Sequence, residues 1–203
     1  MSLITPEELL EHYRGLVDAD SELLPKLIDR ADSLMATFCG LPPYDSGGGA
    51  RSLAANTYTL YLDAPTGQPE RLDLGVRPLV SVTTVHVDAT RAYAAATELT
   101  EGTDFDADLQ LGLLVRAYGS TWPVGWRSSR VVCVAGFETA PPDLVVLVAA
   151  SVQALIDRPN LQQLQSSTIG GQSVSPTDLD HMLPAAVRAE LERSYAIRRC
   201  SHA

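Results

Sequence analysis

Cysteine, lysine and long hydrophobic runs are scarce in this 203-residue chain. Its three cysteines, Cys39, Cys133 and Cys200, lie far apart and form no CxxC pair, which argues against a disulfide framework and against structural zinc. We expect Cys39 and Cys133 to be reduced thiols that pack in the core. The most apolar run, 144–156, is too short to span a bilayer and predicts a buried helix. No basic segment followed by an apolar one opens the chain, so we expect neither a secretory signal nor a membrane partner.

Motifs for catalysis are also missing. The four histidines, His12, His86, His181 and His202, form no HExxH pattern, and we expect each at the surface or in a capping role. No serine lies in a GxSxG turn, so no hydrolase nucleophile is indicated. The glycines at 47–49 lack the Lys-Ser/Thr of a phosphate-binding loop and predict a mobile linker over 41–56.

Three carboxylates alternate at Asp104, Asp106 and Asp108, as in some calcium loops. The glycine and the distal glutamate of an EF-hand are missing, so we interpret the segment as a solvated acidic hairpin. We therefore predict no catalytic residue, no metal ligand, no cofactor and no enzymatic activity.

The composition permits a real core but opposes tight nucleic-acid binding. Hydrophobic residues make up 45% of the chain and charged residues 20%, which is typical of a folded protein. The formal net charge is −10. Affinity for DNA comes mainly from basic groups that neutralise phosphates, whereas an acidic surface around a duplex repels it and lets it slide.

Helices are predicted at both ends of the chain. Thr5, Pro6 and Glu8 form a capping-box start for a helix that we expect to end near Asp18. A three-four apolar repeat over 24–38, with Gly40 placed to stop it, predicts a second helix. Pro142 begins a third helix, which Pro159 ends, and Pro184 begins the last, basic one.

The middle of the chain has a period of two. Residues 57–62 alternate, 72–74 form a short strand, and the parity change in 80–87 predicts a bulge or kink at Thr83–Thr84. We expect 98–108 to be acidic and irregular. Residues 112–116 and 131–137 predict two strands joined by a Trp/Pro/Gly turn, the second of them central because both its faces are apolar.

These elements predict an α+β fold. In it, N- and C-terminal helices form a helical bundle and an antiparallel β-rich region is inserted between them. The expected boundaries are 1–44 for a helical hairpin, 45–140 for the β-rich region, and 141–203 for a long helix, a polar arm and the last helix. The polar segment 160–180 lacks periodicity, and loops of this length are usually functional or disordered.

The order of several short motifs resembles the head–tail connector (adaptor, or head-completion) proteins of tailed phages and of phage-like gene transfer agents. The motifs are Ile4–Leu9, Leu27–Ala31, Pro78–Val82, Gly102–Phe105, Gly112–Arg116, Trp122–Pro123, Ala135–Phe137, Pro142–Leu144, Ile169–Ser175 and Leu183–Val187. The glycine-rich insert at 45–50 and the segment 90–97 depart from the family's pattern.

The resemblance implies a structural subunit of a homo-oligomeric ring, a dodecamer in the particle. The ring would lie in the virion neck beneath the portal protein, extend the DNA channel and dock the next head-completion or tail protein. DNA would only pass through its lumen, without sequence-specific binding. Assembly in the host cytoplasm, and no cofactor or catalysis, are implied as well.

We expect the segment 160–180 and the basic last helix to bind the portal or adjacent subunits. The candidate interface residues are Ile169, Gly170, Gly171, Gln172, Arg188, Arg193, Tyr195 and Arg198. Trp122 and Trp126 are candidate contacts at the turn, plugging it against the sheet or a neighbouring subunit.

Two other functions stay open from the residues alone. One is a stand-alone β-rich module that binds a small ligand on Trp122 and Trp126. The other is a metal-dependent hydrolase that uses the carboxylates of 104–108.

Overall fold

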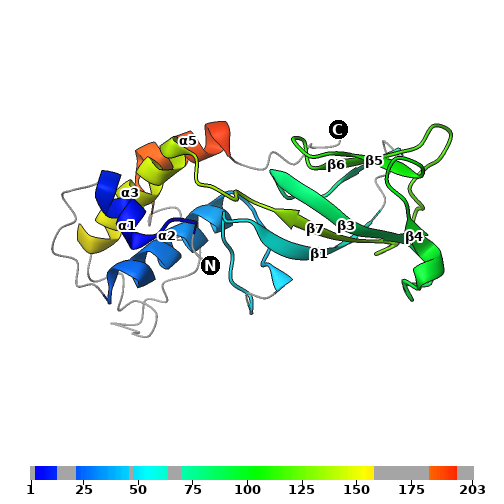
Figure 1. Cartoon of the computed structure of the whole chain (residues 1–203), viewed down its shortest axis with the longest axis horizontal. Helices are drawn as coiled ribbons and strands as arrows, with labels where there is room; N and C mark the ends of the chain where they lie inside the picture. Colours follow the sequence, from blue (N-terminus) through cyan, green and yellow to red (C-terminus); the bar gives the residue numbers. More distant parts are fainter. Residues whose placement is uncertain (1–2, 13–21, 46–47, 64–69, 158–182, 196–203) are drawn as a thin grey trace, which may run out of the picture. The chain divides into compact units, whose positions relative to one another are not determined.

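The chain divides into a helical unit and a β unit. The computed structural model describes residues 3–12, 22–45, 48–63, 70–157 and 183–195. Of these, the helical unit comprises 3–12, 22–41, 51–54, 139–157 and 183–195, and the β unit comprises 42–45, 48–50, 55–63 and 70–138. The fold is α+β with antiparallel sheets between N- and C-terminal helices, so the predicted fold class is confirmed (Figure 1).

Four helices make up the described helical unit: α1 (Pro6–His12), α2 (Leu24–Phe38), α3 (Pro142–Asp157) and α5 (Ala185–Ser194). The capping box is confirmed, because the Thr5 backbone N–H donates to Glu8 and the Glu8 N–H donates to Thr5 Oγ1. The expected extension of α1 to Asp18 lies outside the described residues. Gly40 ends α2 in the left-handed region at φ 82°, where glycine carries no steric penalty.

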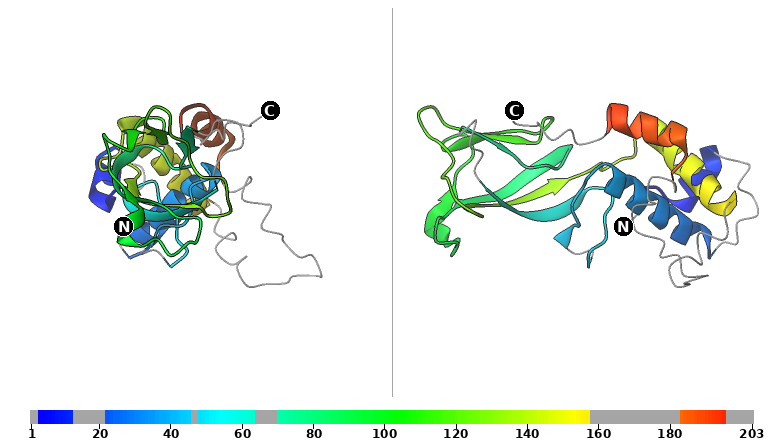
Figure 2. Two further views of the ribbon diagram at one scale, coloured as in Figure 1. Left: turned by 90° about the vertical axis from the view of Figure 1, so that its right-hand side faces the viewer. Right: turned by 180° about the vertical axis from the view of Figure 1, so that it is seen from behind.

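Helix α2 packs against α3, and α1 and α5 each contact both of them (Figure 2). Their shared core is apolar and consists of Leu9, Leu27, Ile28, Met35, Leu144, Val148, Val152, Leu155, Val187 and Leu191. The Ser151 hydroxyl donates to the Leu147 carbonyl within α3, so this buried polar group has a hydrogen-bond partner. The helices at the two ends of the chain thus form one core.

The β unit contains two antiparallel sheets. The larger has the order β1 (Asn56–Leu62), β7 (Ser129–Ala135), β3 (Leu79–Val87), β4 (Glu98–Leu99), and the smaller has the order β2 (Arg71–Asp73), β6 (Leu113–Arg116), β5 (Phe105–Asp108). The 3₁₀ helix η3 (Ala95–Thr97) precedes β4. Figure 1 shows the smaller sheet lying over the larger one. Their buried residues include Tyr58, Leu72, Val85, Phe105, Leu114, Val131 and Cys133.

The predicted central position of β7 is confirmed, because β1 and β3 pair with its two sides. The predicted bulge is confirmed too: Val82 pairs with Cys133 and Thr84 with Val132, so Thr83 is the extra residue. The bulge lets Val82 and Val85 share one face of the sheet, which a uniform strand would prevent.

One prediction for the β unit is wrong. The segment 98–108 contains the strands β4 and β5, although it reads as irregular. The two strands predicted on either side of the Trp/Pro/Gly turn are confirmed as β6 and β7, and they lie in different sheets. The turn therefore connects one sheet to the other.

The segment expected to be a mobile linker is bound to both units. Asp45 accepts hydrogen bonds from the backbone N–H and the hydroxyl of Thr59. Since β1 is an edge strand, this contact pairs a backbone N–H on its open side. Ser52 and the Leu53 N–H donate to Asp32 in α2. The linker interpretation does not hold at these residues.

Candidate functional site

The two tryptophans at the turn have opposite environments. Trp122 is 1% exposed, and its Nε1 donates to the Glu70 carbonyl at 3.2 Å. The Arg116 guanidinium lies 5.4 Å from the centre of the Trp122 ring. Trp126 is 64% exposed. Trp122 therefore anchors the connection between the sheets, and Trp126 is the tryptophan of the turn that is exposed to solvent.

Trp126 belongs to a surface made from three separate segments of the chain. This surface, the arginine–aromatic cluster, consists of Tyr61, Arg91, Tyr93, Trp126, Arg127 and Arg130. Arg127 lies 4.8 Å from the Trp126 ring centre and 5.6 Å from that of Tyr61. Arg91 lies 5.5 Å from Trp126, and Arg130 lies 5.1 Å from Tyr93. The Tyr61 and Tyr93 rings lie 5.7 Å apart, so the cluster is continuous.

The strand register brings these segments together. Leu62 at the end of β1 and Val87 at the end of β3 both pair with Ser129, the first residue of β7. Tyr61 pairs with Arg130 one step further in. The loops that follow β1 and β3 and the one that precedes β7 therefore meet at one end of the larger sheet, and the cluster lies there.

Asp88 shapes the loop that carries Arg91 and Tyr93. Its carboxylate accepts the hydroxyl and N–H of Thr90 and the N–H groups of Ala92 and Tyr93. These hydrogen bonds, that of the Thr90 hydroxyl foremost, lower the pKa of Asp88 because they favour its charged form. The loop is thus held around an ionised carboxylate whose two oxygens both accept hydrogen bonds from the loop itself.

The backbone of the cluster is strained. Arg91, Tyr93 and Arg127 are the three described non-glycine residues with positive φ, at 65°, 48° and 50°. The Asp63 carboxylate accepts the Arg127 N–H at 2.5 Å, and the Tyr93 hydroxyl donates to the Arg127 carbonyl at 2.5 Å. Such conformations cost on the order of 1–3 kcal/mol each and persist where the surroundings fix them, often at functional sites.

The arginines of the cluster have no carboxylate partner in the described part of the chain. The two ion pairs found there join Arg77 to Asp73 and Arg193 to Glu190. Arg91 and Arg127 are exposed, and Arg130 is half-buried. The cluster is therefore an arginine-rich, aromatic surface whose loops also contain the carboxylates of Asp63 and Asp88.

Helix α5 and its C-cap residue Tyr195 include three of the predicted interface residues. It buries Val187 and Leu191 and leaves Arg193 exposed beside Glu190. The Tyr195 hydroxyl donates to the Asp143 carboxylate in α3. Burial first, and then this carboxylate, raise the pKa of Tyr195, so the phenol stays protonated as a donor.

Arg188 is half-buried on α5. The remaining predicted interface residues, Ile169, Gly170, Gly171, Gln172 and Arg198, lie outside the described residues.

The alternating carboxylates serve turns at the two ends of β5. Asp104 accepts the Thr100 N–H at 2.8 Å, and Asp108 accepts the Leu111 N–H at 2.9 Å. Asp106 is exposed between them. The segment is one arm of the β5–β6 hairpin, as the interpretation of an acidic hairpin predicted. In the part of the chain that the structure describes, no group of three His, Cys, Asp or Glu side chains could hold a metal ion.

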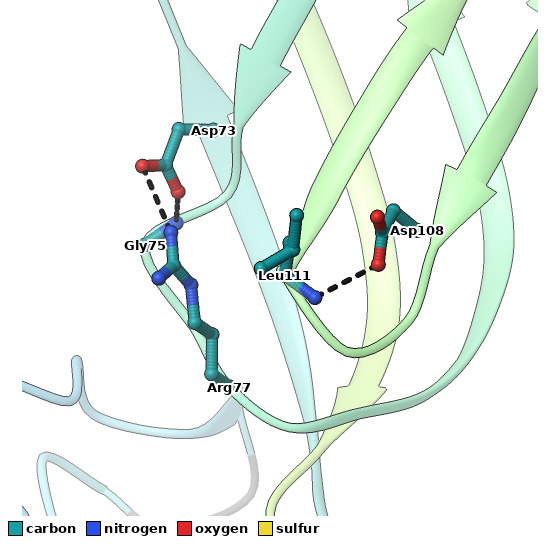
Figure 3. Close-up of polar contacts among 5 residues, drawn as sticks. All are labelled: Asp73, Gly75, Arg77, Asp108 and Leu111. Atoms are coloured by element: carbon teal, nitrogen blue, oxygen red, sulfur yellow. Dashed lines mark hydrogen bonds and ion pairs between the residues drawn. The ribbon is translucent and has the colours of Figure 1, made fainter. Parts of the chain in front are cut away.

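A second carboxylate, Asp73, organises the loop that leaves β2. It accepts the Gly75 N–H at 2.9 Å and a guanidinium N–H of Arg77 at 3.2 Å (Figure 3). The Asp108–Leu111 contact lies in the neighbouring hairpin turn of the same view. Gly112 in that turn faces the Val76 carbonyl so closely that an added Cβ would lie 2.5 Å from its oxygen. These hydrogen bonds and this close approach give the two loops a structural role.

The buried cysteines fit their predicted role. Cys39 and Cys133 are free and buried, and burial raises the pKa of each thiol to about 12. One histidine does not fit: His86 is 5% exposed, with its Nδ1 3.4 Å from the hydroxyl of Thr97 in η3. His181, His202 and Cys200 lie outside the described residues, as does the side chain of His12.

Sequence reasoning identified Trp126 but missed the five other members of the cluster. Their segments are separated by up to 69 positions, from Tyr61 to Arg130, and no spacing rule joins them. One local signal was present. Asp88 two residues before Thr90 favours an Asx-type turn, and that turn positions Arg91.

Among the described residues, no helix has the length and apolar character needed to cross a membrane.

The chain resembles solved structures but neither a family model nor a curated protein. No family model matches it, and no curated protein does. A chain in the "Virion of native gene transfer agent (GTA) particle" is 19% identical, with a TM-score of 0.55, over 98% of this chain and 92% of that one. A chain in the "Neck of empty GTA particle computed with C6 symmetry" is 15% identical, with a TM-score of 0.54, over 89% and 86%.

A third similar chain comes from the "Neck of native GTA particle computed with C12 symmetry". It is 16% identical, with a TM-score of 0.50, over 85% of this chain and 84% of that chain. This chain therefore shares its fold with chains found in the virion and the neck of gene transfer agent particles.

Proposed function

We propose that this protein is a structural head–tail connector subunit in the neck of a phage or phage-like particle. In this role it forms a ring beneath the portal, extends the DNA channel and docks the next neck or tail protein. The supporting observation is the fold shared along almost the full length of both chains with a component of a gene transfer agent virion. The collinear motifs of the sequence support the same role.

The charge of the chain suits a channel subunit. With a formal net charge of −10, a ring of identical copies repels the DNA phosphates and lets the duplex pass. The neck structures with a similar chain were computed with C12 and C6 symmetry, so cyclic copies of the present chain, a dodecamer in the particle, are part of the proposal.

Helix α5 is the proposed contact with the portal or an adjacent subunit. Its Val187 and Leu191 are buried within the helical unit, while Arg193 is 75% exposed in its side chain. An exposed arginine on a helix that is fixed by its own apolar face is a suitable contact for an acidic partner. The segment 160–180 belongs to the same proposed contact.

The proposal is tested by docking purified protein to tailless, DNA-filled heads that carry a portal. The Arg193→Glu variant keeps the buried face of α5, and we expect it to dock more weakly than wild type. Lys26→Glu is the matched control, because Lys26 is an exposed cation on α2. Chain truncated after Asp157 should not dock at all. Wild-type protein that fails to dock to such heads would refute the proposed function.

A further inference from the structure

Four strands lie at the edges of the two sheets in the described β unit, and three of them contain charged residues. The edge strands are β1 and β4 of the larger sheet and β2 and β5 of the smaller one. Strand β4 is two residues long and contains Glu98. Strand β2 is three residues long and contains Arg71 and Asp73, and β5 is four residues long and contains Asp106 and Asp108. Short strands and charged side chains both oppose the addition of a further strand to a sheet edge.

Strand β1 has neither kind of protection. It is seven residues long, Asn56–Leu62, and contains no charged residue, proline or glycine. Its threonines and tyrosines favour extended structure. An edge strand of this length and composition is a template for pairing with an identical strand of another chain.

The Asp45 carboxylate supplies the charge that β1 lacks. Asp45 belongs to the same unit, and its Oδ1 accepts the Thr59 N–H at 2.9 Å while its Oδ2 accepts the Thr59 hydroxyl at 2.7 Å. Because this N–H is bonded to Asp45, the pair that Thr59 forms with Val132 of β7 is a non-hydrogen-bonded one. The backbone groups of Thr59 therefore point away from β7, and by the same alternation so do those of Thr57 and Tyr61.

These three outward-pointing residues make β1 complementary to itself. Two copies of β1 that run antiparallel can place Thr59 opposite Thr59 of the second copy, and Thr57 then lies opposite Tyr61 of the second copy. In this register the Thr59 N–H of each copy donates to the Thr59 carbonyl of the other. Threonine–threonine and threonine–tyrosine pairs across strands are both favourable. Asp45 is bonded to the N–H at the centre of this pairing, so the two arrangements exclude each other.

We propose that the contact of Asp45 with Thr59 is autoinhibitory and prevents β1 from pairing with β1 of a second copy. Such a pair is isologous and closes at two copies, whereas a ring needs heterologous contacts that continue from one subunit to the next. The contact thus keeps single subunits available for assembly. The inference goes beyond the proposed function and holds for the free chain whether or not a ring forms.

The test is sedimentation equilibrium of the purified full chain as wild type and as Asp45→Ala. We expect Asp45→Ala to dimerise on the order of a hundredfold more strongly than wild type. A wild-type dimer must break two hydrogen-bonded carboxylate contacts, one in each copy, and each is equivalent to about a tenfold change in the dimerisation constant. Asp29→Ala is the matched control, because it removes an exposed carboxylate from α2 and changes the net charge equally.

A second substitution shows which surface the dimer uses. Thr59→Pro removes the central N–H without removing a hydrogen bond to β7, and proline is tolerated at outward positions of edge strands. Added to Asp45→Ala, it should return dimerisation to the wild-type level. Asp45→Asn keeps one acceptor oxygen for the Thr59 N–H but no charge, so its dimerisation should lie between those of wild type and Asp45→Ala. This variant also provides the test if Asp45→Ala does not fold.

Three results would overturn the inference. The first is an Asp45→Ala or Asp45→Asn chain that dimerises no more strongly than wild type. The second is dimerisation of Asp45→Ala that persists with Thr59→Pro, because the dimer then uses another surface. The third is a Thr59 amide that exchanges hydrogen in wild type as fast as the amides of Thr57 and Tyr61. None of these affects the proposed function, which is decided by docking to heads, and a failure to dock leaves the inference intact.

Discussion

Ser52 donates a hydrogen bond from its Oγ to Oδ2 of Asp32 at 2.5 Å, and the Leu53 N–H donates to Oδ1 of the same carboxylate at 2.9 Å. Asp32 is 2% exposed in the middle of α2. This buried carboxyl ties the segment 51–54 to the helical unit. Burial, as the largest effect, raises the pKa of Asp32 above its ordinary value of 3.8.

The stability of the helical unit should therefore carry a pH signature from Asp32. The folded chain holds this proton more tightly than the unfolded chain, so stability from this group falls as the pH rises from 3.8 through the raised pKa. The Asp32→Asn variant lacks this dependence. In urea denaturation, the free energy of unfolding of wild type minus that of Asp32→Asn should decrease with pH and then level off. Asp29→Asn, at an exposed site on α2, is the control, and a difference that increased with pH would contradict the account.

Trp122 and Trp126 should respond oppositely to substitution. Trp122→Ala empties a buried site and removes one of the two donors to the Glu70 carbonyl, which keeps the Arg116 N–H, so we expect a loss of about 3–5 kcal/mol in the free energy of unfolding. Trp126→Ala, at a 64% exposed position, should change it by about 0.5 kcal/mol or less. Iodide quenching distinguishes the two independently: the fluorescence of Trp126→Ala, which comes from Trp122 alone, should resist quenching. Equal quenching in both variants would show that Trp122 is not buried.

Gly112→Ala should destabilise the β unit more than Gly102→Ala. Both glycines have positive φ, at 64° and 77°, so both variants share a backbone cost of about 1 kcal/mol. An added Cβ at Gly112 also meets the Val76 carbonyl oxygen at 2.5 Å, whereas nothing lies within 4 Å at Gly102. The difference between the two variants in the free energy of unfolding, measured by denaturant titration, reports the cost of the contact with the Val76 carbonyl. Equal losses of stability in the two variants would mean that the backbone at Gly112 moves away from the Val76 carbonyl at no cost.

Tyr195→Phe should loosen α5 without unfolding the rest. The variant keeps the ring but loses the hydrogen bond to Asp143, which we expect to cost about 1 kcal/mol. Amide hydrogen exchange should then speed up in α5 relative to α3. Tyr118→Phe is the control because Tyr118 is fully exposed. Unchanged protection of α5 would show that this contact does not hold the helix.

Patterns within one element were predictable, and relations between elements were not. The helix α2 and the strand β1 follow from the spacing of their own apolar residues, and the bulge at Thr83 follows from a parity change inside β3. The pairing of β6 and β7 with different sheets does not follow, because alternation identifies a strand and says nothing of its neighbours. For the same reason the burial of His86, beside Thr97, was unexpected.

The candidate site shows the same division. Trp122 and Trp126 look alike in the sequence, since both lie beside proline or glycine in one turn. Only the packing of Trp122 beside Arg116 and Glu70 separates the anchor from the exposed residue. The cluster itself depends on three loops meeting at one end of a sheet, and that meeting is set by strand register.

The most direct test of the proposed role is electron cryomicroscopy of particles that carry this protein with a small label fused to one end. The account predicts label density in the neck, repeated with cyclic symmetry around the DNA channel beneath the portal. Label density on the capsid shell or along the tail, with none at the neck, would contradict it.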